Sequence, residues 1–366
     1  MHKTLRLSLL LAGALPLASG CGAPVEPSDA ANGTSMASRS EGLGTTAATW
    51  TINAPMKASR SDHTLTVLNS GLVLVEGGIQ GGTRLRSAEL YDPYTDTWTV
   101  TGAPNEARVN ARATRLASGK VLVVGGSNST TSGSPTAELY DPDTGTWSYT
   151  GSLNTGRSSF TLTLLDSGKV LVTGGMAHGG TFTSTAEVYD PDTGTWSYTG
   201  PKAIVGFFQA ATKLYSGEVL VTGSVSPARN AEIYNPSTNS WRTATNVPGP
   251  HAFHSTIRLY SGQVLLTGGG NGQGDTAETY LYDPFNDQWT RGPDMKQARG
   301  QDHALILLYS GQVMAASGDS AEIYDPTTNT WTLSTSGKPG LHARRTGLLH
   351  TGQVLFAGSE TTRYTP

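Results

Sequence analysis

The sequence predicts an all-β protein in which seven four-stranded sheets form a closed ring, the architecture of a seven-bladed β-propeller. Thr136–Gly151 returns with one change as Thr185–Gly200, and a period in the forties is typical of propellers and solenoids. The 45 glycines and only 14% charged residues suit many tight turns better than helices. The chain also has seven Trp and seven Ser-Gly or Thr-Gly turns. These observations predict one ring over residues 48–366.

The first 20 residues are expected to be a signal peptide rather than part of the ring. Lys3 and Arg6 form a basic region before an apolar segment, Leu7–Leu17. This segment is too short to span a bilayer as a helix. The next four residues, Ala18–Cys21, resemble a bacterial lipobox, which implies that Cys21 is lipidated and becomes the first mature residue. An ordinary secretory signal cut nearby is the alternative. Lipidation also explains the presence of a lone cysteine in an exported protein.

Residues 21–47 are expected to form the lipidated Cys21 and a flexible tether. Small and polar residues dominate this segment, so it cannot bury enough apolar surface to offset the entropy of ordering. We therefore expect a protein anchored to the bacterial cell envelope by lipid, or secreted if Cys21 is not lipidated. The formal net charge is −3 and no basic stripe is present, so nucleic acid is not an expected partner. A monomer is expected.

Each repeat begins with two strands, here called a and b, joined by a tight turn. The turn glycine suits the positive φ of such hairpins, and it recurs at Gly71, Gly119, Gly168, Gly217, Gly262, Gly311 and Gly352. Strand b follows as a continuous apolar run such as Val121–Val124, which predicts burial on both faces. Strand b ends in small residues such as Gly77-Gly78, which allow neighbouring backbones to approach closely.

The second half of each repeat is a strand c with Ala-Glu-x-Tyr and a strand d with Trp. In the connecting turn, Pro142 fixes φ and Gly145 tolerates the left-handed conformation, and the same turn chemistry recurs in six copies. The last unit, Leu341–Pro366, contains no Trp, whereas Trp50 precedes the first complete unit. We therefore expect Ala48–Asn53 to supply strand d of the last blade, which closes the ring and removes exposed sheet edges.

The order Gly-Gly, Tyr, Trp resembles the kelch repeat over residues 48–366. The motif Tyr-Asp-Pro-x-Thr-Gly-x-Trp is similar to sequences of bacterial secreted kelch-like proteins. This resemblance implies a kelch-type β-propeller. Galactose oxidase has a similar fold, and its radical site needs a Cys cross-linked to a copper-binding Tyr. Because Cys21 lies outside the predicted ring, copper-radical oxidation of that kind is not expected. No cofactor and no bound metal are predicted.

Acidic residues recur in strand c of nearly every unit. A feature present in every blade is interpreted as structural, with each carboxylate bonded to backbone or to an Arg of strand a. The predicted row consists of Glu89, Glu138, Glu187, Glu232, Glu278, Glu322 and, in the last unit, Glu360.

The candidate ligand site lies where the variable loops converge. The a–b and c–d turns share one end of a blade, and the variable b–c and d–a connections share the other, where function concentrates. Strand a is expected to be innermost, so residues at its loop end should line the channel mouth. Three histidines there could bind a metal, although polar residues lining a wet channel are the preferred interpretation. The predicted ligand-binding residues are His63, Arg112, Phe208, Phe253, His254, His303 and Arg344.

Glu76 departs most sharply from the repeat, because its equivalents are Val, Thr or Ala. If Ser70-Gly71 forms a two-residue turn, Glu76 faces Leu65, and His63 is its diagonal neighbour. Such a carboxylate–imidazole pair could perform acid–base catalysis, and a plain ion pair is the preferred interpretation.

The function expected from the sequence is a non-catalytic binding module at the cell envelope, with a protein or a glycan held on the face formed by the b–c and d–a loops. The alternatives are a carbohydrate-active hydrolase, lyase or epimerase with Glu76 and His63 at the channel mouth, and a purely structural surface protein. Glycoside hydrolysis usually needs two carboxylates in one pocket, and the sequence offers one candidate.

Overall fold

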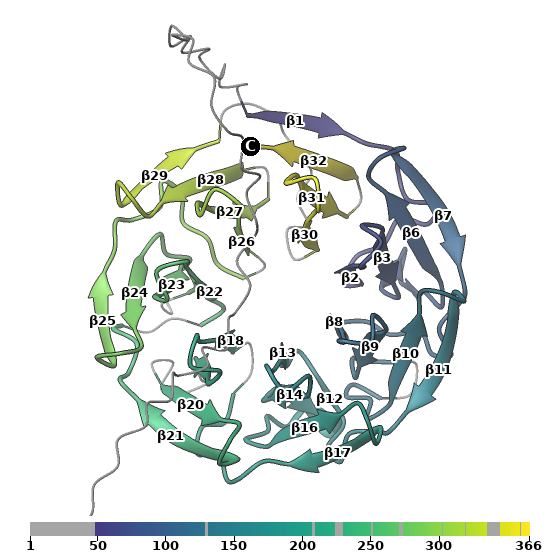
Figure 1. Cartoon of the computed structure of the whole chain (residues 1–366), viewed down its shortest axis with the longest axis horizontal. Coiled ribbons are helices and arrows are strands. Elements are labelled where there is room, and N and C mark those ends of the chain that lie inside the picture. The colour runs from purple at the N-terminus through teal and green to yellow at the C-terminus, as the bar shows by residue number, and fades with distance from the viewer. Residues whose placement is uncertain are drawn as a thin grey trace, which may run out of the picture. The chain divides into compact units, whose positions relative to one another are not determined.

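The computed structural model describes residues 48–128, 131–206, 209–223, 230–249, 252–270, 274–301, 303–318, 320–334, 345–358 and 360–366. These residues belong to one compact unit, Ala47–Pro366, whose sheets are arranged in a ring around a central axis (Figure 1). Within the described ranges, no helix has the length and apolarity needed to cross a membrane.

Seven four-stranded antiparallel sheets form the blades, and in each the strands run from a at the axis to d at the rim (Figure 1). The a strands are β2 (Thr64–Val67), β8 (Arg112–Arg115), β13 (Thr161–Leu164), β18 (Ala210–Lys213), β22 (Ser255–Arg258), β26 (Ala304–Leu307) and β30 (Thr346–Leu348). The b strands are β3 (Val73–Glu76), β9 (Val121–Val124), β14 (Val170–Thr173), β19 (Val219–Thr222), β23 (Val264–Thr267), β27 (Val313–Ser317) and β31 (Val354–Ala357). The c strands are β6 (Ala88–Asp92), β10 (Ala137–Asp141), β16 (Ala186–Asp190), β20 (Ala231–Asn235), β24 (Thr279–Asp283), β28 (Ser320–Asp325) and β32 (Thr361–Thr365). The d strands are β7 (Thr97–Thr101), β11 (Thr146–Thr150), β17 (Thr195–Tyr198), β21 (Ser240–Ala244), β25 (Gln288–Arg291), β29 (Thr330–Leu333) and β1 (Thr49–Ile52).

The predicted ring closure is confirmed. Strand β1 pairs antiparallel with β32, which places Trp50 opposite Tyr364 in the last blade. Their ring centroids lie 5.0 Å apart, close to the 4.9 Å of Tyr91 and Trp98 in the first blade. The N-terminal strand therefore completes the seventh copy of the Tyr–Trp pair and covers what would otherwise be an open sheet edge.

The b strands form the core, as their apolar runs predict. All four residues of β9 are buried, and their side chains alternate between the two neighbouring blades. Leu122 and Val124 pack toward the third blade, whereas Val121 and Val123 pack toward the first. Apolar surface is thus removed from water on both faces of each sheet, at roughly 25 cal/mol per Å².

The a–b turn has three residues rather than two, which changes one predicted register. The Leu68 amide donates to the Leu72 carbonyl at 2.8 Å, and Gly71 has a φ of 86°. Thr64 therefore lies opposite Glu76, and Leu65 lies opposite Val75. The expectation that Glu76 faces Leu65 was wrong because a three-residue hairpin shifts the pairing by one residue.

The glycines after strand b permit the close approach that they predict. A Cβ at Gly77 would lie 2.7 Å from the Arg108 carbonyl oxygen of the next blade, and Gly77 has a φ of 67°. The neighbouring Gly78 amide donates to that same carbonyl at 2.8 Å. The b–c loop of one blade is thereby joined to the d–a connection leading into the next.

The strand c acids are structural in five blades. Glu89 accepts hydrogen bonds from the Lys57 and Ala58 amides and forms an ion pair of 2.7 Å with Arg60. The cation belongs to the d–a connection rather than to strand a. Equivalent pairs join Arg108 to Glu138, Arg157 to Glu187, Lys202 to Glu232 and Arg299 to Glu322.

The row was mispredicted in the other two blades. Strand pairing gives Tyr280, not Glu278, the position equivalent to Glu89, and in the last blade it gives Thr362, not Glu360. Glu278 instead lies near the surface and pairs with Arg291 at 3.4 Å.

Candidate ligand site at the channel mouth

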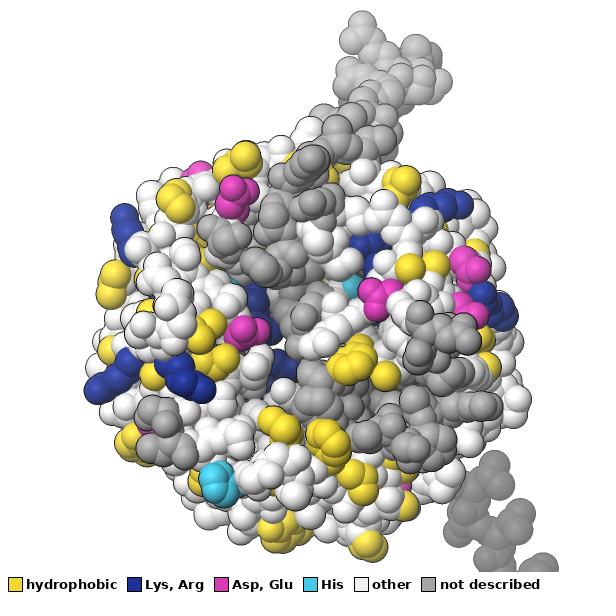
Figure 2. All heavy atoms as spheres, turned by 180° about the vertical axis from the view of Figure 1, so that it is seen from behind, with side chains coloured by type: hydrophobic (Ala, Val, Ile, Leu, Met, Phe, Trp, Pro, Cys, Tyr) yellow, Lys and Arg dark blue, Asp and Glu magenta, His cyan; other side chains and the backbone are white. Residues whose placement is uncertain are grey.

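A cavity of about 420 Å³ lies on the axis of the ring, bounded by residues at or next to the a strands. Figure 2 shows basic side chains reaching the central hollow of the face it presents. Five of the predicted residues line this cavity: His63, Arg112, Phe253, His254 and His303. Phe208 and Arg344 lie outside the described residues, as does Cys21. Arg345, which the sequence analysis missed, also lines the cavity, at the repeat position of Arg112 and Thr64.

Two of the histidines connect adjacent blades. The last residue of β19, Thr222, contacts His254 Nε2 at 2.7 Å through its hydroxyl, and Thr267 at the end of β23 contacts His303 Nε2 at 2.8 Å. The end of strand b therefore faces the start of strand a in the next blade. These contacts are structural links between blades, and the two histidines also form part of the cavity wall.

His303 is held in one neutral tautomer. Its Nδ1 lies 2.7 Å from the Gly300 carbonyl, which can only accept, so Nδ1 carries the proton and Nε2 accepts from Thr267. Burial, helped by the charge of nearby Arg299, lowers the pKa of His303 to about 4 against the raising effect of the Gly300 hydrogen bond. Both ring nitrogens are thus committed to the protein, which leaves His303 as a wall residue with little capacity to bind a ligand.

Arg112 is the basic group best placed for a ligand. Its Nε donates to the Phe160 carbonyl at 3.2 Å and one Nη donates to the Ala111 carbonyl at 3.4 Å. Burial lowers the pKa of Arg112, while Asp62 partly opposes the shift. No carboxylate among the described residues forms an ion pair with this guanidinium.

Glu76 lies outside the cavity wall and does not pair with His63. It is 1% exposed, and its one hydrogen bond within the described chain is accepted by Oε1 from the Thr64 hydroxyl at 3.0 Å. Burial raises its pKa to about 7, against the lowering effect of Arg108. The strand-a residue of the next blade is Ala111 here, so Glu76 has no histidine of the kind that Thr222 and Thr267 contact.

Phe253 has an unusual backbone for a bulky residue, with a φ of 63°. The residue two positions before strand a is left-handed in the first three blades too, where it is Asp62, Asn110 or Ser159. Those smaller residue types adopt this conformation readily, whereas an aromatic residue is strained there. Phe253 lines the cavity in this strained conformation. In the sequence, Phe208 occupies the same repeat position one blade earlier.

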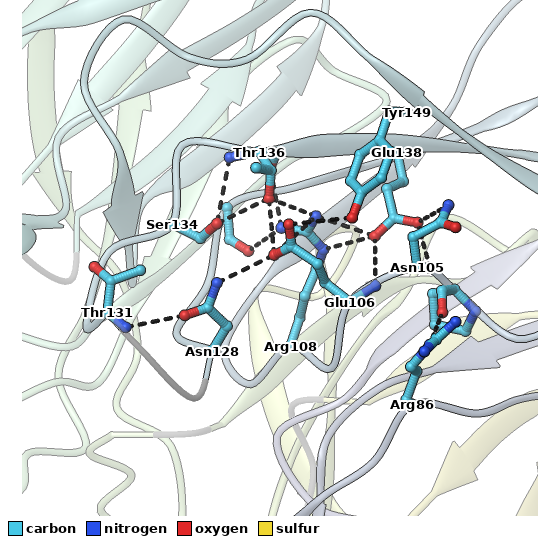
Figure 3. Close-up of polar contacts among 12 residues, drawn as sticks. Arg86, Asn105, Glu106, Arg108, Asn128, Thr131, Ser134, Thr136, Glu138 and Tyr149 are labelled. Atoms are coloured by element: carbon cyan, nitrogen blue, oxygen red, sulfur yellow. Dashed lines mark hydrogen bonds and ion pairs between the residues drawn. The ribbon is translucent and has the colours of Figure 1, made fainter.

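Buried polar networks hold the loops that surround the cavity. Figure 3 shows the network of the second blade, where Arg108 donates to the carbonyls of Gly125 and Thr136, both at 3.0 Å. Glu138 binds Arg108 and the Asn105 amide, and Glu106 accepts from the Thr136 hydroxyl at 3.0 Å. The d–a connection and the b–c loop are therefore joined by charged hydrogen bonds, which fix the rim of the site before a ligand arrives.

Fold and site together define a β-propeller with a cavity of ligand size at the end of its channel. A model of the kelch motif matches residues 59–103, 116–154 and 162–202. The chain is therefore a seven-bladed β-propeller that carries kelch motifs over these three ranges.

Two comparisons relate the chain to known oxidases. Galactose oxidase from Gibberella zeae is 35% identical over 95 residues, a match that covers 22% of this chain and 14% of that protein. A solved structure of a fungal alcohol oxidase of the AA5 family, in complex with copper, matches with a TM-score of 0.71 and 17% identity. That match covers 87% of this chain and 76% of the oxidase chain and shows a shared fold.

The donor set around the cavity does not fit a copper-radical centre. No group of three His, Cys, Asp or Glu side chains in the described part of the chain is placed to hold a metal ion. The ε nitrogens of His254 and His303 bind threonine hydroxyls. The chain's one cysteine, Cys21, precedes the first strand of the ring.

Proposed function

We propose that the protein is a non-catalytic binding module that takes up a glycan at the channel mouth. The observation that carries this proposal is the cavity of about 420 Å³ on the axis, lined by side chains from all seven blades. Its volume falls within the range of roughly 300 to 1,000 Å³ that small-molecule sites occupy. The rigid ring positions the wall, and the variable loops above it supply selectivity.

Aromatic side chains at the site favour a glycan ligand over a protein partner with a flat surface. Phe253 lines the cavity in a strained conformation, which is costly unless the site uses it. Phe182, on the b–c loop of the third blade, is 40% exposed.

The b–c loops also differ in structure: the first blade carries the hairpin of β4 (Ile79–Gln80) and β5 (Thr83–Arg84). The third carries β15 (Met176–Ala177), which pairs with β12 (Arg157–Ser158), and the short 3-10 helix η1 (His178–Gly180).

The geometry favours binding over the catalytic alternative. Glu76 lies opposite Thr64 of its own blade and accepts a hydrogen bond from that hydroxyl, so the acid–base pair with His63 is not assembled. No aspartate or glutamate is found among the described residues that line the cavity, whereas glycoside hydrolysis usually requires two. Oxidase activity like that of the AA5 relative would need a donor set that the described cavity does not offer.

A cavity-blocking variant tests the proposal. Ala210 lines the cavity on β18, so Ala210→Trp should abolish binding on a glycan array probed with the full chain. Val100→Trp on β7 is the matched control, because residue 100 is 70% exposed at the rim of the ring. Glycan binding that survives Ala210→Trp would place the ligand elsewhere. Absence of glycan binding, with capture of a protein through the loop face, would replace the glycan by a protein partner.

A further inference from the structure

We infer that the cavity selects a small acidic sugar and that Arg112 receives its carboxylate, an inference that rests on the proposed glycan-binding function. It names the chemical class of the ligand, which the binding proposal leaves open. The residues that carry it are the charged groups of the cavity wall and their partners within the protein.

The charge of the wall is one-sided. The described residues that line the cavity include Arg112 and Arg345, none is an aspartate or glutamate, and His303 is held neutral. The protein as a whole has a formal net charge of −3, so this cationic lining is a local feature. A concave site with one sign of charge concentrates ligands of the opposite sign.

Arg112 differs from the four buried arginines of the d–a connections, because no described carboxylate forms an ion pair with it. Arg60, Arg108, Arg157 and Arg299 each form an ion pair of 3.1 Å or less with a strand c glutamate. Arg112 instead donates to two backbone carbonyls, and its remaining guanidinium N–H groups make no hydrogen bond within the described chain. A largely desolvated cation without a counter-charge is costly, and a ligand carboxylate would relieve that cost.

The shape of guanidinium specifies the ligand group. Its planar fork binds carboxylates through two parallel hydrogen bonds, which adds orientation to charge attraction. The two carbonyl contacts are made by Nε and one Nη of Arg112 and leave the other Nη for the ligand. Asp62 is the acidic group whose charge acts on Arg112, but it forms no ion pair with it. The cavity of about 420 Å³ is large enough for a monosaccharide or the terminal residue of a longer glycan.

Calorimetry with uronic acids tests the inference. D-galacturonate and D-glucuronate should bind the full chain, and galactose and glucose should bind at least ten-fold more weakly. Arg112→Gln should weaken uronate binding at least ten-fold, because hydrogen bonds to charged groups are the strong ones. Raising the salt concentration should weaken uronate binding and leave neutral sugars unaffected. Arg115→Gln is the matched control, since Arg115 is on the same strand and donates to the Val67 carbonyl outside the cavity wall.

The outcomes separate this inference from the function on which it rests. Neutral sugars that bind as tightly as uronates, or uronate affinity unchanged in Arg112→Gln, would overturn the acidic ligand while the glycan-binding function stands. No binding of any acidic or neutral glycan would overturn both. Thermal unfolding of Arg112→Gln checks the fold, and its melting temperature should hold or rise because a buried cation without a counter-charge is removed.

Discussion

Glu76 shows how one residue can depart from the repeat without entering the site. It replaces the Val, Thr or Ala of the other blades and is buried, and the next blade has Ala111 at the repeat position of His254 and His303. Burial raises its pKa to about 7, above the ordinary value of 4.5. The folded protein therefore binds a proton more tightly than the unfolded chain between these pH values.

A pH-dependent gain in stability is the expected result of Glu76→Gln. Ionisation of Glu76 destabilises the folded state as pH rises from about 4.5 through 7, and the cost above pH 7 is on the order of 3 kcal/mol. Gln retains an acceptor for the Thr64 hydroxyl and cannot ionise. In urea denaturation, the variant should exceed the native chain in stability at pH 8, and the difference should shrink toward pH 4.5. Exposed Glu360→Gln is the control, and parallel pH curves for Glu76→Gln and the native chain would contradict the shift.

At the scale of the element, the end of strand b determines how one blade attaches to the next. Thr222 and Thr267 each bind a histidine from the following blade. Thr173 occupies the same repeat position, but its buried hydroxyl has no hydrogen-bond partner among the described residues. The same residue type is thus satisfied in two blades and unsatisfied in a third, because the opposing residue differs.

Valine substitutions at these positions should have opposite effects. Thr222→Val removes the hydroxyl that His254 contacts, so it should destabilise the protein by about 1 to 3 kcal/mol. Thr173→Val removes a buried hydroxyl with no partner and should be neutral or stabilising. Chemical denaturation of both variants at pH 8 measures the difference. Equal losses at the two sites would show that the His254 contact contributes nothing to blade attachment.

For the whole molecule, closure of the ring depends on four N-terminal residues. Thr49–Ile52 pair with β32, and the Trp50 indole donates to the Ser334 hydroxyl of the sixth blade at 3.1 Å. Strand β1 therefore connects the last blade to its neighbour. Without it, β32 would present an unpaired edge to solvent.

Two truncations of the chain test this closure. A chain that begins at residue 47 keeps β1 and should unfold at nearly the same temperature as the longer protein. A chain that begins at residue 55 loses β1 and should have a sharply lower melting temperature and a tendency to aggregate, because a sheet edge is exposed. Scanning calorimetry and light scattering measure both effects. Equal melting temperatures would mean that Trp50 contributes little to ring closure.

The sequence by itself determined the repeat, the number of blades, the Tyr–Trp pairs and the closing strand. Each of these depends on local chemistry that recurs: a glycine where φ is positive, an apolar run where both faces are covered, and an aromatic pair across one hairpin. Trp50 could be assigned to the last blade because the last unit has no Trp of its own. Counting the Trp residues was sufficient for this assignment, since the segment around Trp50 was the one source left for the missing strand of the last blade.

Tertiary structure decided the register of Glu76, the true strand c position of Tyr280 and the partners of the interior arginines. A one-residue difference in turn length reverses which face a side chain occupies, and residue types alone do not reveal that length. The cavity likewise joins His63, Arg112 and Arg345, which are far apart along the chain and meet only when the ring closes. Whether a cation finds an anion depends on packing between blades, so Arg108 is ion-paired and Arg112 is left facing the channel.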